Sequence, residues 1–138
     1  MSFLKLNFIP LNLNLGLLLL RIILGGTMLI FHGWIKLINF KSRFHSFPDV
    51  LGISNEASYI LATWFETLGA AGIILGFYTR LNALGLFIVM MVAFIFVHNM
   101  NIGGGNSGEL ALIYGAGYLL LFLAGGGQFS FDRKMGIR

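Results

Sequence analysis

The sequence predicts an all-α fold: a polytopic membrane four-helix bundle with a partly helical outer loop between the first and second helices. Of its 138 residues, 57% are hydrophobic and 10% are charged, whereas a soluble domain carries about 25% charged residues. The mean hydropathy is +0.87. The apolar residues gather in four runs that suit helices crossing a bilayer. We therefore expect a single membrane domain, residues 1–138, with spans at about 13–38, 57–78, 81–100 and 108–124.

The first span is expected to begin after Pro10, because proline is a poor residue inside a helix. Residues 1–12 mix apolar and polar side chains and resemble an interfacial lead-in. The span then continues through residue 38, and Trp34 lies where an aromatic ring would meet the far interface.

The long connection at residues 39–56 is polar but interleaved with aromatic and aliphatic side chains. Such apolar surface suggests a segment that lies on the membrane or folds as a lid over the bundle mouth, although a plain surface connector fits equally well. The next two helices are joined by a tight turn and should be antiparallel neighbours. A glycine-rich turn at 101–107 precedes the last helix, which Ser107 can cap.

The basic residues predict the orientation. Four spans place both termini on one side, which collects most of the lysine and arginine residues outside the apolar runs. The positive-inside rule then places both termini in the cytoplasm and residues 39–56 and 101–107 outside. We expect a multi-pass protein of the bacterial cytoplasmic (inner) membrane. The net charge of +4 is dispersed over the ends of the spans, so it does not indicate nucleic-acid binding.

Ionisable residues inside the apolar runs mark the candidate functional residues, because a charge in hydrocarbon costs roughly 2.5 to 3.5 kcal/mol and must find a partner or a wet cavity. At about 100° per residue, Arg21, His32 and Lys36 share one stripe of the first helix. Arg21 would lie about 12 Å deep and Glu66 about 18 Å deep, a difference that an arginine side chain can span. We therefore expect a structural ion pair between Arg21 and Glu66, with a direct ligand role as the equal alternative.

A second cluster should form toward the outer leaflet, at the mouth of the bundle. Two histidines, a base and an acid converging there could bind an oxygen-bearing head group or relay protons. Each member also has a simpler explanation: snorkelling for the lysine, a helix-terminus acid for the glutamate, and an interfacial hydrogen bond for a histidine. The spacing on three separate helices gives little support for a metal site, and we expect none. The candidate ligand-binding residues are His32, Lys36, His98 and Glu109.

Motifs spread over about residues 14–132 resemble those of the DoxX family of small four-helix membrane proteins. The motifs are Arg21 with Gly25, His32-Gly33 and Lys36-Leu37, Glu66 with Gly69, Leu75-Gly76, Thr79-Arg80, Ala93, His98, the glycine-rich turn before Glu109-Leu-Ala-Leu, and the closing Gly-Gly-Gly-Gln-Phe-Ser-Phe-Asp132. The resemblance implies a link with membrane redox systems, since the family name comes from a subunit associated with thiosulfate:quinone oxidoreductase. The chain has no cysteine and so cannot itself supply the thiols of sulfur chemistry.

From the residues and the resemblance we expect a redox-associated subunit that binds a quinone or another small amphipathic ligand in an outer-leaflet polar pocket. No intrinsic cofactor is expected beyond a bound quinone, and whether the chain is itself an enzyme is left open. The expected partners are the lipid bilayer and a membrane or peripheral oxidoreductase subunit, and a homo-oligomer is compatible with the sequence. One alternative is a non-catalytic membrane anchor or assembly partner. A small-solute transporter is less favoured, because no helix is visibly broken in its middle.

Overall fold

The computed structural model describes residues 10–137 and shows an all-helical bundle; residues 1–9 of the expected lead-in lie outside this range. The first span runs without a break over Leu13–Ile38. It consists of α1 (Leu13–Met28), the π-helical turn η2 (Leu29–Gly33) and α2 (Trp34–Ile38). The Asn12 side chain caps its start by accepting a hydrogen bond from the Leu15 N–H.

The second span is Asn55–Leu75, made of α4 (Asn55–Trp64), η3 (Phe65–Gly69) and α5 (Ala70–Leu75). It ends at Leu75 rather than at Tyr78, because Gly76 adopts the left-handed conformation that closes many helices. The Ser54 hydroxyl caps its start by accepting a hydrogen bond from the Ala57 N–H. The short helix α3 (Phe40–Arg43) lies between the two spans, which confirms a partly helical outer loop.

The third span, Thr79–Val97, joins α6 (Thr79–Val92) to η4 (Ala93–Val97). The fourth helix, α7 (Glu109–Ala124), is apolar but has only 16 residues. A last short helix, α8 (Phe131–Lys134), follows the glycine run. Within residues 10–137, three helices are therefore long and apolar enough to cross a membrane, and α7 is a shorter apolar helix beside them.

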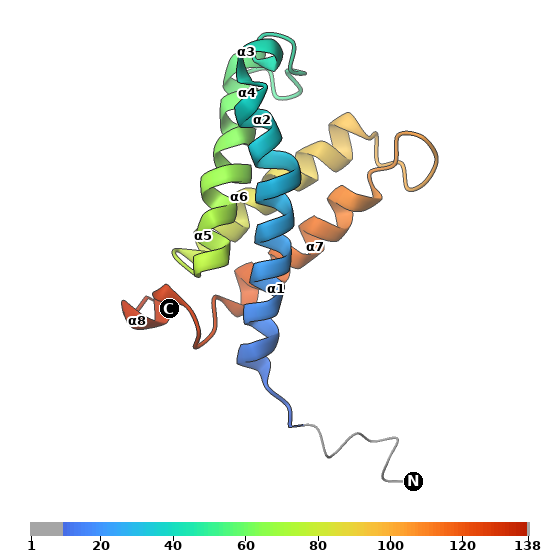
Figure 1. Cartoon of the computed structure of the whole chain (residues 1–138). Helices are drawn as coiled ribbons and strands as arrows, with labels where there is room; N and C mark the ends of the chain where they lie inside the picture. Colours follow the sequence, from blue (N-terminus) through green and yellow to red (C-terminus); the bar gives the residue numbers. More distant parts are fainter. Residues whose placement is uncertain (1–9, 138) are drawn as a thin grey trace.

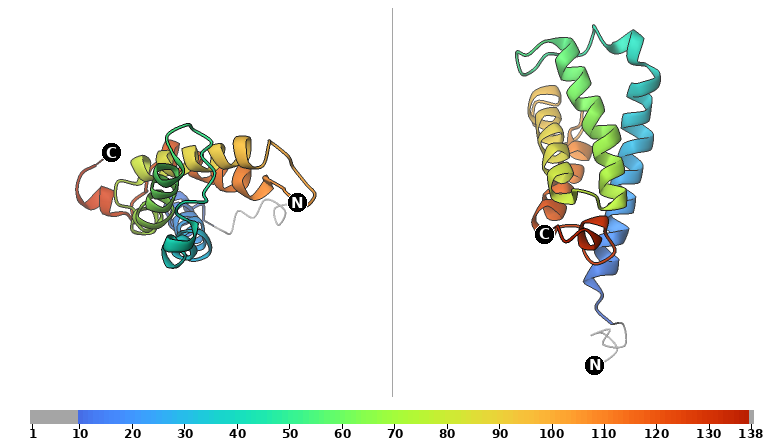
Figure 2. Two further views of the ribbon diagram at one scale, coloured as in Figure 1. Left: turned by 90° about the horizontal axis from the view of Figure 1, so that it is seen from above. Right: turned by 90° about the vertical axis from the view of Figure 1, so that its left-hand side faces the viewer.

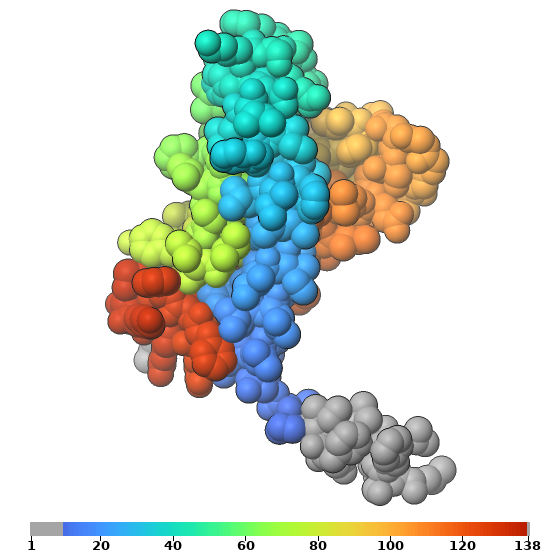
Figure 3. Space-filling model, viewed as in Figure 1, coloured from blue at the N-terminus to red at the C-terminus, as the bar shows by residue number. Residues whose placement is uncertain are grey.

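The helices form two antiparallel hairpins that cross obliquely. Figure 1 shows α1–α2 upright beside α4–α5, with α6 and α7 running across them and away toward the glycine-rich turn. The two views in Figure 2 show the same two layers from above and from the side. Within each hairpin, α1 packs against α5 and α6 against α7, while α6 also contacts η3. Because the hairpins cross at an angle, they approach at one end and separate at the other, where Figure 3 shows the α6–α7 lobe standing apart from α2.

Small residues set the closest approaches between helices. Gly33 lies directly against the backbone of the second span, and a Cβ atom there would overlap the Glu66 carbonyl oxygen. Gly25 also lies close to the second span, since an added Cβ there would be 2.9 Å from the Ala70 carbonyl oxygen. These contacts bring the first two spans together where their polar side chains lie.

We predict that Gly33→Ala lowers the thermal stability of the purified protein, because backbone atoms opposite the new methyl group cannot move aside cheaply. Overpacking of this kind costs about 1 to 3 kcal/mol. The matched control is Gly26→Ala, since an added Cβ at Gly26 meets nothing within 4 Å. Melting curves in detergent compare the two variants, and equal melting temperatures would contradict the assigned contact.

The topology gives a second prediction, since the native chain has no cysteine. Single cysteines replacing Ser46 and Asn106 should react with a membrane-impermeant thiol reagent in intact cells, and one replacing Lys134 should not. All three positions are exposed in the structure, so accessibility depends on the side of the membrane. The reverse labelling pattern would overturn the orientation expected from the basic residues.

Candidate functional site

A cavity of about 790 Å³ lies between the two hairpins, on the side where they separate. Its walls are apolar side chains of the second, third and fourth spans, and residues 46–51 of the outer loop cover part of it. Its polar residues include His32, Lys36 and Glu66. The cavity therefore combines apolar walls with a small group of ionisable side chains, as ligand pockets commonly do.

An ion pair between the Lys36 ammonium and the Glu66 carboxylate joins the first and second spans at this cavity. The Glu66 side chain is 5% exposed and that of Lys36 is 18% exposed. The phenol of Tyr59 donates a hydrogen bond of 2.7 Å to the Lys36 carbonyl oxygen and fixes the backbone behind the pair. Lys36 therefore does not extend to the interface as a snorkelling lysine would.

The predicted ion pair between Arg21 and Glu66 is wrong. Glu66 pairs with Lys36, while the Arg21 Nη2 donates a hydrogen bond of 2.7 Å to the Phe129 carbonyl oxygen. Lys36 lies on the same helical stripe as Arg21 and meets Glu66 directly across the helix contact at Gly33. Arg21 reaches the opposite way because the C-terminal segment folds back under the bundle, which helix periodicity does not reveal.

The structure brings three of the four expected ligand residues to the cavity. His32, Lys36 and His98 line it, and Glu109 does not. The His32 ring packs edge-on against Tyr114, with ring centroids 5.8 Å apart. His98 lies near the glycine-rich turn, where its Nδ1 is 3.1 Å from the Asn106 side-chain oxygen.

Glu109 lies outside this group, as an exposed residue in the first turn of α7. Its backbone N–H donates a hydrogen bond to the Ser107 hydroxyl oxygen. A carboxylate there suits the positive end of the helix dipole. The expectation that Glu109 shares the cavity with the histidines is therefore wrong. From this part of α7, Leu110, Ala111 and Tyr114 line the cavity instead.

Each long span contains one π-helical turn, and all three turns contribute to the cavity. The segment η2 supplies His32, η3 supplies Phe65 and Glu66, and η4 supplies Ala93 and Val97. Such wide turns are rare and occur often at functional sites, because they redirect side chains without ending the helix. They are wide turns in continuous helices, so none of the spans is broken. The sequence carries no recognisable pattern for them, and they were not predicted.

The outer loop is held over the cavity mouth by Asp49. Its carboxylate accepts hydrogen bonds from the backbone N–H groups of Ile53 and Ser54, each 3.0 Å long, and from the Ser58 hydroxyl. Burial raises the pKa of Asp49, but these hydrogen bonds outweigh it and leave the pKa below its ordinary value. Phe47 packs edge-on against Tyr59 at 5.2 Å between ring centroids. The loop therefore folds over part of the cavity, as expected for a lid over the bundle mouth rather than for a plain surface connector.

Sequence reasoning did not identify Tyr114 and Phe47 as cavity residues. Tyr114 could have been found as a polar-tipped side chain within an otherwise apolar helix. Phe47 could not, because its position depends on how the loop folds. Among residues 10–137, no group of three histidine, aspartate or glutamate side chains is arranged to hold a metal ion.

Comparisons with known proteins identify the family of this chain. The family model of DoxX matches residues 16–99, which cover the first three spans and include Lys36, Glu66 and His98. The chain belongs to the DoxX family. It is also 32% identical over 120 residues to an uncharacterised protein of Haemophilus influenzae, covering 83% of this chain and 87% of that relative. No solved structure matches the chain.

We predict that Lys36 and Glu66 are energetically coupled. Glu66→Gln or Lys36→Met alone leaves one charge without its partner in a mostly buried site, at a cost of about 3 to 5 kcal/mol. The double variant should lose less stability than the sum of the two single variants. Melting temperatures of the wild type, the two single variants and the double variant in detergent give this double-mutant cycle. The matched control combines Arg21→Leu with Glu66→Gln, whose effects should add; coupling in that pair instead would reinstate the original pairing.

Proposed function

We propose that this DoxX-family membrane protein is a redox-associated subunit that binds a quinone or another small amphipathic molecule in the cavity beside the Lys36–Glu66 ion pair. The observation that carries the proposal is that the hydrogen-bonding groups of the Lys36–Glu66 pair lie in a cavity with apolar walls. The cavity volume, about 790 Å³, falls in the usual range of small-molecule sites, about 300 to 1,000 Å³. An aromatic ring with an apolar tail would pack against the apolar walls and direct its oxygen atoms to the ion pair.

The polar side chains of the cavity can hydrogen-bond both oxidation states of such a ligand. The Lys36 ammonium is a hydrogen-bond donor and suits the carbonyl oxygen of a quinone. The Glu66 carboxylate is an acceptor and suits the hydroxyl group of a quinol. His32 can donate or accept according to its tautomer. Reduction of a quinone takes two electrons and two protons; these side chains bind and exchange protons, and we assign electron delivery to a partner oxidoreductase subunit.

A specific observation also supports the non-catalytic alternative, a membrane anchor or assembly partner. The Lys36–Glu66 pair and the Gly33 contact together fix the register of the first two spans. A buried ion pair can serve that purpose without any ligand. The two proposals differ in what happens when a cavity residue outside the ion pair is removed.

We predict that His32→Ala weakens binding of a short-chain ubiquinone by roughly tenfold, the loss of one hydrogen bond and one ring contact, and moves the melting temperature little. The protein would be reconstituted in lipid nanodiscs and the bound quinone measured by equilibrium dialysis. The matched control is His45→Ala, since His45 lies on the exposed outer loop, pairs with Glu56 and does not line the cavity. A wild-type protein that retains no quinone, with His32→Ala reducing stability alone, would favour the anchor instead.

A further inference from the structure

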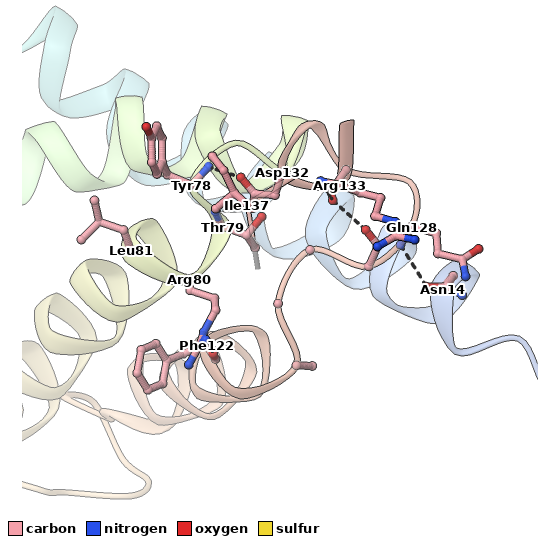
Figure 4. Close-up of a pocket in the computed structure, with 15 residues that line it drawn as sticks. Asn14, Tyr78, Thr79, Arg80, Leu81, Phe122, Gln128, Asp132, Arg133 and Ile137 are labelled. Atoms are coloured by element: carbon pink, nitrogen blue, oxygen red, sulfur yellow. Dashed lines mark hydrogen bonds between the residues drawn. The ribbon is translucent and has the colours of Figure 1, made fainter. Parts of the chain in front are cut away.

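A second cavity, of about 560 Å³, lies at the opposite end of the bundle, where α1 begins, α6 begins and α7 ends. Figure 4 shows it between the first turn of α6 and the glycine run that follows α7. Its lining includes Asn14, Thr79, Arg80, Gly126 and Arg133. The proposed quinone site uses none of these residues.

The C-terminal segment builds this cavity by folding back under the helices. The Asp132 carboxylate accepts hydrogen bonds from the backbone N–H groups of Tyr78, at 2.6 Å, and Thr79, at 2.8 Å, and so caps α6 from a distant part of the chain. The Asn14 side-chain oxygen accepts a hydrogen bond from the Gln128 N–H. Gly125 and Gly127 have positive φ, which lets the backbone turn closely beneath the bundle.

Buried polar atoms around this segment lack partners. Within residues 10–137, the Arg21 Nε and Nη1 atoms and the Thr79 hydroxyl are buried without a hydrogen bond. Thr79 is fully buried and lines the cavity. Leaving a buried hydroxyl unsatisfied costs about 1 to 3 kcal/mol, and the Thr79 hydroxyl can donate to a molecule in the cavity. Arg21 is not among the lining residues; its guanidinium lies against Gly76 and adds a positive charge nearby.

The charges at the cavity also favour an anion. Among residues 10–137, the lining includes two cationic residues, Arg80 and Arg133, and one acidic residue, Asp132. Both Asp132 oxygens already accept backbone hydrogen bonds. The Arg80 Nε donates to the Phe122 carbonyl oxygen at 2.9 Å, and its guanidinium carbon lies 5.3 Å from the Phe122 ring centroid. This anchoring holds the side chain in place and leaves its terminal nitrogens as the donors for a ligand.

We propose that this cavity binds the phosphate group of an anionic phospholipid from the leaflet on the side of the termini. The cavity lies at the helix ends, which is the depth of lipid phosphates at a bilayer surface. Exposed aromatic residues flank it, with Phe129 55% and Phe131 47% exposed, and these can enter the interface beside a lipid. Basic pockets between helices at the cytoplasmic surface are a known mode of lipid head-group binding. A free phosphate ion has the same chemistry and is the other source to be distinguished.

The test measures the melting temperature of the full-length protein in a neutral detergent with added short-chain phosphatidylglycerol, phosphatidylcholine or inorganic phosphate. We expect phosphatidylglycerol to raise the melting temperature and phosphatidylcholine to have little effect. Stabilisation by inorganic phosphate at the same concentration would identify the free ion as the source. No stabilisation by either anion would overturn the proposal.

Two variants and their matched controls locate the effect. Arg133→Gln should weaken phosphatidylglycerol binding about tenfold, whereas Lys134→Gln removes the same charge one residue further on, outside the cavity lining, and should not. Equal losses in these two variants would show only general attraction to a basic tail and would overturn the site. Thr79→Val should also reduce binding, and its control is Thr63→Val, because the Thr63 hydroxyl is likewise buried and unpartnered but lies away from the cavity. An unchanged lipid response in both Thr79→Val and Arg133→Gln would refute the assignment.

Discussion

The Lys36–Glu66 ion pair is the interaction on which the rest of the bundle depends. Two charged groups in an apolar bundle are tolerated only when they meet, since each alone would carry a large desolvation penalty. Their meeting fixes the first two spans in one register, and Gly33 makes the meeting possible by letting the backbones touch. Tyr59 then ties the end of the first span to the second through the Lys36 carbonyl oxygen. The first hairpin is therefore held by polar contacts in addition to apolar core residues such as Leu24 and Ile73, whereas α6 and α7 pack mainly through apolar and small side chains.

In the part of the chain that the structure describes, the larger cavity forms where the two hairpins are not linked by hydrogen bonds. Near the C-terminal segment the first span is tied to the end of the chain, because Arg21 donates to the Phe129 carbonyl oxygen and Asn14 accepts from the Gln128 N–H. Toward the other end, within residues 10–137, no hydrogen bond joins the hairpins beyond that from the Tyr118 phenol to the Leu24 carbonyl oxygen, and the space between them opens beside the ion pair. The three π-helical turns widen the helices at that level and aim His32 and Glu66 into the space. The outer loop, held by Asp49, then covers part of the opening.

The fold was largely predictable, because four apolar runs separated by turn residues specify a helical bundle in a membrane. Lys36, His32 and His98 could be placed near one another from their spacing along helices that alternate in direction. The partner of Glu66 could not be chosen from depth alone, since Arg21 and Lys36 lie on the same stripe and a long side chain can extend either way. Two tertiary contacts determine the pairing. Gly33 packs beside Glu66, and the C-terminal segment places the Phe129 carbonyl oxygen where Arg21 can donate to it. For the same reason Glu109 was misplaced, because helical rotation at the start of α7 could not be fixed from the sequence.

The cavities at the two ends of the bundle differ in how their charged residues are paired, and this difference determines the kind of ligand proposed for each. In the larger cavity Lys36 and Glu66 satisfy one another, and Arg43 of the outer loop is a further cation in the lining; a bound molecule gains from hydrogen bonding and apolar contact. At the end near the termini, the carboxylate of Asp132 is already occupied by backbone N–H groups, while Arg21 and Thr79 retain unused donors. A neutral ligand would leave the lining residues Arg80 and Arg133 without a counter-charge, whereas a phosphate group supplies that charge and also an acceptor for the Thr79 hydroxyl. The same short chain can thus present a site for a neutral amphipathic molecule at one end and for an anionic head group at the other.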